Sequence, residues 1–377
     1  MHFDPATPHV CERSDHSQRP RVTLLNDTSC FHHGSHIVVE QIRKLCAAHG
    51  LNLWHTVRLG DDWRGEHHRK RLAESDVVLV NGEGTLHHDR RTARVLARCA
   101  EFCRQRNLPC FLINSVYQGN GKKMAHFVRQ FTFVFVRESR SQTELHNEGI
   151  ASAVVPDMTM ALNCFPQRSR NGILITDSSS NEASMKLHQF YSQTDGVEFA
   201  NLFKPTFASQ KLRMLTAAAM GRLVPQRWFW EWRSRSFMRP QPPFAATSIR
   251  KNVHELCRQI SSSSLIVTGR FHMVCLAMLA RTPFIAVGGN THKIEGLLAD
   301  AGLTNRYVSS LSNDIDPAVW SKWHDDELAR VEAYLSNARS GVSRMFSRIC
   351  QSANVPRQWA AFFIKFATPL LQGALVL

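Results

Sequence analysis

Short apolar runs alternate along the chain with longer stretches in which apolar residues recur at helical spacing. In the first half, this pattern predicts strands at 21–25, 76–80, 110–113, 131–136 and 151–155, and helices at 37–49, 91–106 and 139–148. The second half repeats it, with strands at 172–176, 197–202, 264–267, 283–287 and 306–309 and helices at 251–261, 271–281, 293–301 and 325–338. Such alternation is typical of α/β proteins with parallel sheets. We therefore expect two Rossmann-like domains that face each other across a cleft.

The same pattern divides the chain into regions. Residues 1–20 predict a polar N-terminal tail, 21–165 and 166–345 predict the two domains, and 346–377 predict an apolar C-terminal tail. We expect residues 359–377 of this tail to pack on a domain as a closing helix, and an interfacial membrane anchor is the alternative.

An insertion at 222–251 stands apart from the α/β pattern. It holds seven basic residues, one acidic residue and the tryptophans Trp228, Trp230 and Trp232. A substrate lid, a membrane-interface patch, a platform for single-stranded nucleic acid and an ordinary helix with an aromatic face all fit this composition.

Composition adds a surplus of positive charge. The chain has 377 residues, of which 43% are hydrophobic and 20% charged, and this ordinary globular composition excludes disordered, collagen-like and coiled-coil proteins. Lys and Arg number 46 against 31 Asp and Glu, which gives a net charge of +15, and only 11 of the 46 are lysines. Because arginine binds phosphate and carboxylate in a bidentate manner, the surplus indicates an anionic ligand, a nucleic acid or a membrane surface.

Cysteines and the N-terminus bear on the cellular compartment. The ten cysteines are scattered without a CxxC pair, which favours reduced thiols over a metal site. The first 20 residues lack the apolar segment of a secretion signal, and no run of 18 residues is free of charge. We expect a cytoplasmic protein, with peripheral contact to the inner membrane left open.

Polar or glycine-containing motifs follow the predicted strands. Ligands of open parallel sheets bind beyond the carboxyl ends of the strands, so these motifs predict an active site between the two domains. The motifs lie at 26–29, 81–89, 114–119, 137–139, 156–157, 268–272 and 288–293.

The motif around Arg270 is the sharpest candidate for an anion site. Arg270 and His272 lie where a helix begins, so amide donors and the helix dipole would add to two cationic side chains. A clamp between Arg270 and a carboxylate of the other domain is the alternative. Arg137 follows an apolar strand, where it would either meet an anion or form an internal salt bridge with Glu138 or Glu144.

The motif at 81–89 offers acid–base chemistry. Glu83 lies between two glycines, where it could bind sugar hydroxyls, act as a base, or bond backbone amides in a tight turn. His87 and His88 could exchange protons, with Asp89 orienting one imidazole. The patterns GxxxxGK[ST], GxGxxG, GxSxG and HExxH are absent, so the markers of P-loop kinases, dinucleotide oxidoreductases, serine hydrolases and zinc proteases are missing. We predict no cofactor and no metal.

Taken together and in order, these motifs resemble the polysaccharide pyruvyl transferase family. The resemblance is carried by NGEGTLHHD (81–89), NSVYQ (114–118), VRESRSQTELHNEGI (136–150), TGRFH (268–272) and PFIAVGGNTHKIEGLL (283–298), and it covers about residues 22–308. Many members have three glycines where this chain has Gly82-Glu83-Gly84, so a role for Glu83 transfers less readily. The resemblance implies two Rossmann-like domains arranged as in GT-B glycosyltransferases, with the acceptor on the N-terminal domain and the donor on the C-terminal domain.

The resemblance also implies an activity. Family members transfer the pyruvyl group of phosphoenolpyruvate to a pair of sugar hydroxyls, here on a cell-surface glycan or its lipid-linked oligosaccharide precursor. The Arg-x-His donor motif corresponds to Arg270 and His272, a second donor arginine to Arg137, and an acceptor-side histidine to His87 or His88. A GT-B-type glycosyltransferase that uses a nucleotide sugar is the alternative. A nucleic-acid partner is disfavoured, because it would leave the histidines and acids at the strand ends without a role.

The predicted site residues form two groups. The catalytic group consists of Glu83, His87, His88 and His272. The substrate-binding group consists of Asn26, Asp27, Arg137, Arg270, Phe271, Asn290, His292 and Lys293.

Overall fold

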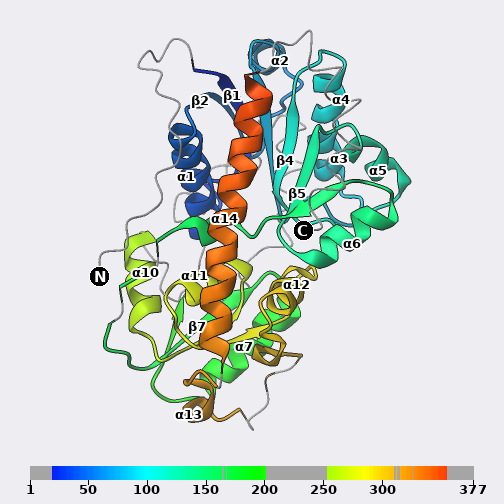
Figure 1. Cartoon of the computed structure of the whole chain (residues 1–377). Helices are drawn as coiled ribbons and strands as arrows, with labels where there is room; N and C mark the ends of the chain where they lie inside the picture. The colour runs from blue at the N-terminus through cyan, green and yellow to red at the C-terminus, as the bar shows by residue number, and fades with distance from the viewer. Residues whose placement is uncertain are drawn as a thin grey trace, which may run out of the picture.

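The computed structural model describes residues 19–200 and 253–354, except 164, 167, 310, 312–314 and 325. This part of the chain forms two parallel sheets, and a long helix, α14 (Glu327–Ala353), runs along both halves of the molecule (Figure 1). The predicted α/β fold with two Rossmann-like domains is confirmed. The insertion at 222–251, residues 1–18 of the N-terminal tail and residues 355–377 of the C-terminal tail lie outside the described residues.

The first sheet has the strand order β2-β1-β3-β4-β5-β6, and every neighbouring pair is parallel. Its central strands are buried along their whole length because apolar clusters cover both faces. The strands are β1 (Arg21–Asp27), β2 (Asn52–Arg58), β3 (Val77–Glu83), β4 (Cys110–Ser115), β5 (Phe133–Val136) and β6 (Ser152–Val154). The helices are α1 (His33–Ala48), α2 (Glu66–Ala73), α3 (Arg91–Ala97), α4 (Cys99–Arg104), α5 (Lys122–Val128) and α6 (Ser139–Asn147).

The second sheet has the order β11-β10-β9-β7-β8 and is also parallel throughout. A short 3-10 helix, η2 (Met158–Ala161), leads into it from β6. The strands are β7 (Ile173–Ser178), β8 (Val197–Ala200), β9 (Leu265–Gly269), β10 (Phe284–Val287) and β11 (Tyr307–Val308). The helices are α7 (Asn181–Ser192), α10 (Val253–Ser262), α11 (Phe271–Leu279), α12 (Lys293–Asp300) and α13 (Pro317–Trp320).

The two sheets share one topology. In each, the second strand lies at one edge, the first strand lies beside it, and the later strands follow on the other side of the first. The strand order therefore reverses between β1 and β3 in the first sheet and between β7 and β9 in the second. Crevices at such switch points are where open α/β sheets bind ligands.

Helix α14 connects the two domains. Its first half packs on the core of the second domain through Val331 and Leu335, and its second half packs on the core of the first domain through Phe346 and Ile349. The sequence predicted a helix over 325–338 only and a tail from residue 346. The structure places residues 346–353 inside this helix, because its buried face changes from one core to the other instead of ending. The remaining domain bounds stay a prediction.

Several elements were not predicted. Strand β2 is an edge strand with mostly half-exposed residues, so it lacks the apolar run that marks the central strands. Helices α2, α5 and α7 were also missed, and the helix expected over 91–106 is broken at Arg98 into α3 and α4. Among the helices of the described residues, none is long and apolar enough to cross a bilayer.

Candidate functional site

A cavity of about 460 Å³ lies between the two domains, at the carboxyl ends of both sheets. Of the predicted site residues, its lining contains Asn26, Glu83, Arg137, Arg270, Phe271, His272, Asn290 and Lys293. The lining does not include the other four predicted residues, which are Asp27, His87, His88 and His292. The carboxyl ends of the strands therefore bring together eight of the predicted residues, from turns that are far apart in the sequence.

Arg270 lies at the switch point of the second domain, directly before α11. Its Nε lies 2.9 Å from Oδ1 of Asp177 at the end of β7, and its Nη2 donates to Oδ2 of the same carboxylate. The sequence left an anion site and a carboxylate clamp between domains as alternatives. The clamp exists, but it joins β7 to the turn after β9 within one domain, and Arg270 lines the cavity at the same time.

Arg137 is 1% exposed at the end of β5 and forms an internal salt bridge. Its partner is Asp157, with Nη1 2.9 Å from Oδ2, and not Glu138 or Glu144 as the sequence suggested. The guanidinium carbon also lies 4.3 Å from the centre of the Phe271 ring. Arg137 is thus held by an acid from the first domain's last turn and an aromatic ring from the second domain.

Asp157 links the two domains through its charge. His272 of α11 brings its Nε2 to 3.6 Å from the carboxylate oxygen that binds Arg137. Burial would raise the pKa of Asp157, but the charges of His272 and Arg137 outweigh it and hold this pKa well below its usual value. An ionised, buried Asp157 therefore holds Arg137 of the first domain and lies beside His272 of the second.

Lys293 opens α12 and is only 8% exposed. Its Nζ donates to Oδ1 of Asn290 at 2.8 Å. Burial first, and then the charges of Arg137 and Arg270, lower the pKa of Lys293 to about 7. The charges of these three groups therefore disfavour one another, and an anion placed among them would relieve that repulsion.

His32 belongs to this group and was missed as a site residue. It caps the N-terminus of α1, where its Nδ1 accepts from the backbone N–H of Ser35 at 3.0 Å. Its ring centre lies 5.1 Å from that of His272 across the domain boundary, and it lines the cavity. Burial, followed by His272 and Arg270, lowers the pKa of His32 well below its usual value, so the imidazole is neutral. The signal available in the sequence was a histidine at the start of the helix that follows the first strand, which is a position where ligands bind.

Glu83 ends β3 with a positive φ of 40°, a strained backbone for a glutamate. Its Oε1 accepts from the hydroxyl of Thr28 at 2.5 Å, and its Oε2 accepts from the hydroxyl of Ser35 at 3.0 Å. The carboxylate is therefore held by side-chain hydroxyls, not by the backbone amides of a tight turn as one alternative proposed. It lines the cavity from the first domain.

His87 and His88 are not part of the cavity lining. His87 is fully buried, and burial, followed by Arg90, Lys293 and His88, lowers its pKa to about 3. The two Nδ1 atoms lie 2.8 Å apart, while His88 is exposed on the other side. Neither lines the cavity, so the structure favours Glu83 as the group that reaches it from this motif.

Asp27 and His292 have structural partners. Asp27 Oδ2 accepts from Arg43 of α1 at 3.0 Å. His292 lies against α6, with Nε2 3.3 Å from Oε1 of Glu138, and its backbone N–H donates to Gln118 at 2.8 Å. His292 therefore ties the second domain to the first instead of facing the cavity.

Residues 57–64, which comprise the last two residues of β2 and the segment after it, form a further wall of the cavity. Trp63 is its aromatic member, and the indole Nε1 is bonded to the carbonyl of Val95 at 2.8 Å. Asp61 and Asp62 add carboxylates at this end, where Arg64 is paired with Asp62. The sequence missed this wall because it did not predict β2.

The cavity is strongly cationic. The cationic residues in its lining are Arg58, Arg64, Arg90, Arg91, Arg137, Arg270 and Lys293, against the acids Asp61, Asp62 and Glu83. Such a site can bind a small polyanion by charge-assisted hydrogen bonds. Two groups of metal-ligating residue types lie outside the cavity lining, namely His55 with His67 and His68, and Cys99 with Cys103 and Cys110.

Comparison with known proteins places the chain in a family. The family model described as polysaccharide pyruvyl transferase matches residues 32–291. No curated protein matches the chain. Among solved structures, the chain is similar to UDP-GlcNAc 2-epimerase from Methanocaldococcus jannaschii in complex with UDP-GlcNAc and UDP. The sequence identity is 12% and the TM-score is 0.46, and the match covers 88% of this chain and 98% of that chain. A functionally uncharacterized protein from Klebsiella pneumoniae is similar with 12% identity and a TM-score of 0.42 over 78% of this chain and 94% of that chain.

Proposed function

The chain belongs to the polysaccharide pyruvyl transferase family, and we propose that it transfers the pyruvyl group of phosphoenolpyruvate to two hydroxyls of a glycan or its lipid-linked precursor, forming a ketal. The observation that carries the proposal is the group of buried cations where the two domains meet. Arg270 and Lys293 of the second domain and Arg137 of the first converge on one cavity. Phosphoenolpyruvate carries a phosphate and a carboxylate in one small molecule, so it matches several cations held close together.

The second domain provides the donor end of the proposed site. Arg270 and Lys293 each lie at the start of a helix, so the N-termini of α11 and α12 add positive potential to their charges. His272 lies beside them with its ring toward Asp157. In this arrangement Arg270 and Lys293 bind the phosphate, and His272 assists as the phosphate leaves.

The reaction forms two carbon–oxygen bonds and breaks one. A proton adds to C3 of the donor, and the first sugar oxygen bonds to C2 as its hydroxyl proton is removed. The bond between C2 and the phosphate oxygen then breaks, its electron pair leaves with the phosphate, and the second sugar oxygen bonds to C2 with loss of its proton. The two hydroxyls lose two protons in total. C3 gains one proton, and the released phosphate carries the other. A general acid and a base are therefore needed.

Glu83 is the group that we assign to the acceptor hydroxyl. It reaches the cavity from the first domain, and its carboxylate already accepts hydrogen bonds from the hydroxyls of Thr28 and Ser35. His87 does not reach the cavity, and its lowered pKa makes it a poor base at neutral pH. The wall at 57–64 offers Trp63 and two carboxylates, groups that suit a sugar ring and its hydroxyls.

Thermal unfolding with two ligands tests the donor. Phosphoenolpyruvate is expected to raise the melting temperature of the full chain, and UDP-GlcNAc is not; at 100 times its Kd, a ligand stabilises by about 2.7 kcal/mol. Arg270→Gln is expected to lose this shift and the release of phosphate from phosphoenolpyruvate with glycan acceptors, whereas Arg344→Gln, at an exposed position of α14, keeps both. A shift with the nucleotide sugar alone, or an unchanged response of Arg270→Gln, would contradict the proposal.

A further inference from the structure

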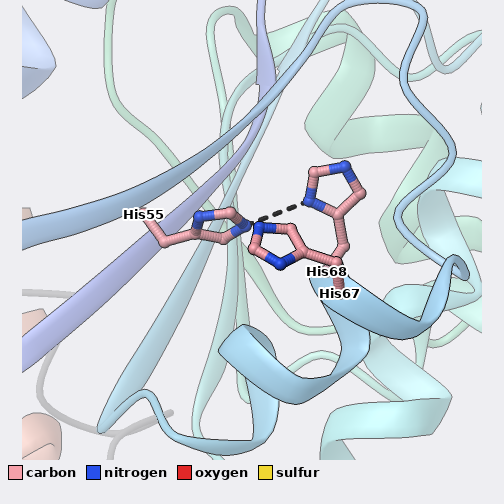
Figure 2. A group of neighbouring side chains, drawn as sticks. All are labelled: His55, His67 and His68. Atoms are coloured by element: carbon pink, nitrogen blue, oxygen red, sulfur yellow. Dashed lines mark hydrogen bonds between the residues drawn. The ribbon is translucent and has the colours of Figure 1, made fainter.

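Three histidines meet on the first domain, outside the lining of the cavity just described. His55 projects from the edge strand β2, and His67 and His68 are neighbours in the first turn of α2. Figure 2 shows the three rings turned toward one another across the gap between this strand and this helix. No metal was predicted, because the cysteines are scattered, and the His67-His68 pair, 12 residues from His55, was not singled out.

The geometry of the rings suits one metal ion. One ligand nitrogen from each ring lies within 4.8 Å of the other two, and His55 Nε2 lies 3.1 Å from His68 Nδ1. Zinc–nitrogen bonds of about 2.0–2.1 Å in a tetrahedral site place neighbouring nitrogens about 3.3 Å apart. The His55–His68 pair is already at that spacing. His67 is exposed, so its ring can rotate by the remaining distance without disturbing a core.

We propose that His55, His67 and His68 form a binding site for a zinc-class divalent metal ion, with a fourth position open to water. Three imidazoles and no carboxylate select zinc, nickel or copper over magnesium and calcium, which prefer oxygen ligands.

One cationic side chain near the rings has partners of its own. Arg71 lies near His55, but its Nη1 is 3.7 Å from the carboxylate of Glu74, and its guanidinium carbon is 4.8 Å from the centre of the Trp54 ring. The positive charge of Arg71 is therefore partly balanced beside the proposed metal site.

A metal ion here would act on the cavity through the chain. Residues 59–65 connect β2 to α2, and residues 59–64 line the cavity. An ion held by His55 on one side and by His67 and His68 on the other would close this segment into a short loop. Closing a loop removes conformational freedom from its residues, so the ion would hold the cavity wall that contains Trp63.

Zinc binding by the full chain, with any affinity tag removed, tests the site. Calorimetric titration with Zn²⁺ is expected to show one site per chain that His55→Ala weakens at least tenfold. The double variant His67→Ala/His68→Ala is expected to behave alike, and it keeps the fold because both residues lie in the first turn of a surface helix. The matched control is His146→Ala, an exposed histidine of α6, which is expected to bind as the wild type does.

Two further readouts separate this site from other ligands. Co²⁺ bound by three imidazoles gives visible d–d bands without the thiolate charge-transfer band that ligation by Cys99, Cys103 and Cys110 would add. Zn²⁺ is also expected to slow proteolysis within residues 59–65 in the wild type and not in His55→Ala. Binding that is equal in the wild type and both histidine variants, or a Co²⁺ spectrum that shows the thiolate band and is unchanged in His55→Ala, would overturn the proposal. Neither result would bear on phosphoenolpyruvate binding.

Discussion

Replacing Lys293 by methionine probes the cost of gathering cations in the cavity. Methionine keeps an unbranched apolar side chain that is one heavy atom shorter, and it removes the charge. Burial and the charges of Arg137 and Arg270 disfavour the charged ammonium. They lower the pKa of Lys293 from 10.5 to about 7. We expect Lys293→Met to make the ligand-free protein more stable at neutral pH and to weaken anion binding.

The magnitude follows from the two pKa values. In the unfolded chain the lysine binds a proton up to pH 10.5, whereas in the folded chain it loses half of its proton by about pH 7. Stability therefore rises with pH between these values, and at pH 7 the charge costs about 4 kcal/mol. The variant loses the bond to Asn290, worth about 1 kcal/mol. We expect a net gain of about 3 kcal/mol at pH 7, falling to about 1 kcal/mol at pH 9.

Urea unfolding at pH 7 and pH 9, with and without phosphoenolpyruvate, measures both effects. Without ligand, the midpoint of the variant is expected to exceed that of the wild type, by more at pH 7 than at pH 9. With ligand, the wild type is expected to recover the difference, because the anion neutralises the charge that destabilised it. A variant that is less stable than the wild type at pH 7, or a difference that does not change with pH, would refute the reasoning.

Three further substitutions have expected outcomes. Asp157→Asn leaves Arg137 buried without its carboxylate and is expected to lower the free energy of unfolding in urea by about 3–5 kcal/mol. In the wild type, the stabilisation by the ionised Asp157 is present above the ordinary pKa of an aspartate. It is lost as the pH falls through the lowered pKa of Asp157. Gly34→Ala would place a Cβ 2.5 Å from the Cβ of His272, so weaker phosphoenolpyruvate binding is expected by calorimetry, whereas Gly84→Ala meets only the Lys293 Nζ at 3.7 Å and should bind normally. Phe346→Ala removes a fully buried ring from the face of α14 that packs on the first domain, and calorimetric melting should show a loss of about 3–5 kcal/mol, against little change for Arg344→Ala.

The central strands could be predicted from the sequence because they are buried on both faces. Strands β3 and β4 lie in the middle of the first sheet, so every residue must be apolar or paired, and the run is visible without a partner. The edge strand β2 has only one buried residue, so its sequence lacks the continuous apolar run that identifies a central strand. The full length of α14 was hidden for a different reason, since its apolar face serves two cores and no local signal marks the change.

The sequence predicted the place of the cavity better than it predicted which residues line it. Motifs after the strands were expected to converge, and Glu83, Arg137, Arg270 and Lys293 do so. Which member of a motif faces the cavity depends on backbone direction at each strand end, so Glu83 reaches it while His87 does not. The partners of the cations, Asp157 and Asp177, could not be assigned because they lie 20 and 93 residues away from the arginines that they bind.

The sequence by itself determined the α/β class, the two-domain repeat and the turns that carry the chemistry, because hydrophobic periodicity and turn residues are local properties of the chain. Only the tertiary structure decided how the arginines are used. Arg137 and Arg270 each have a carboxylate partner and still line the cavity, and Lys293 has its pKa lowered by both of them. It also brought His55 to the pair on α2. Charge interactions and metal geometry depend on distances between side chains, and those distances exist only after the sheets are assembled and the domains have met.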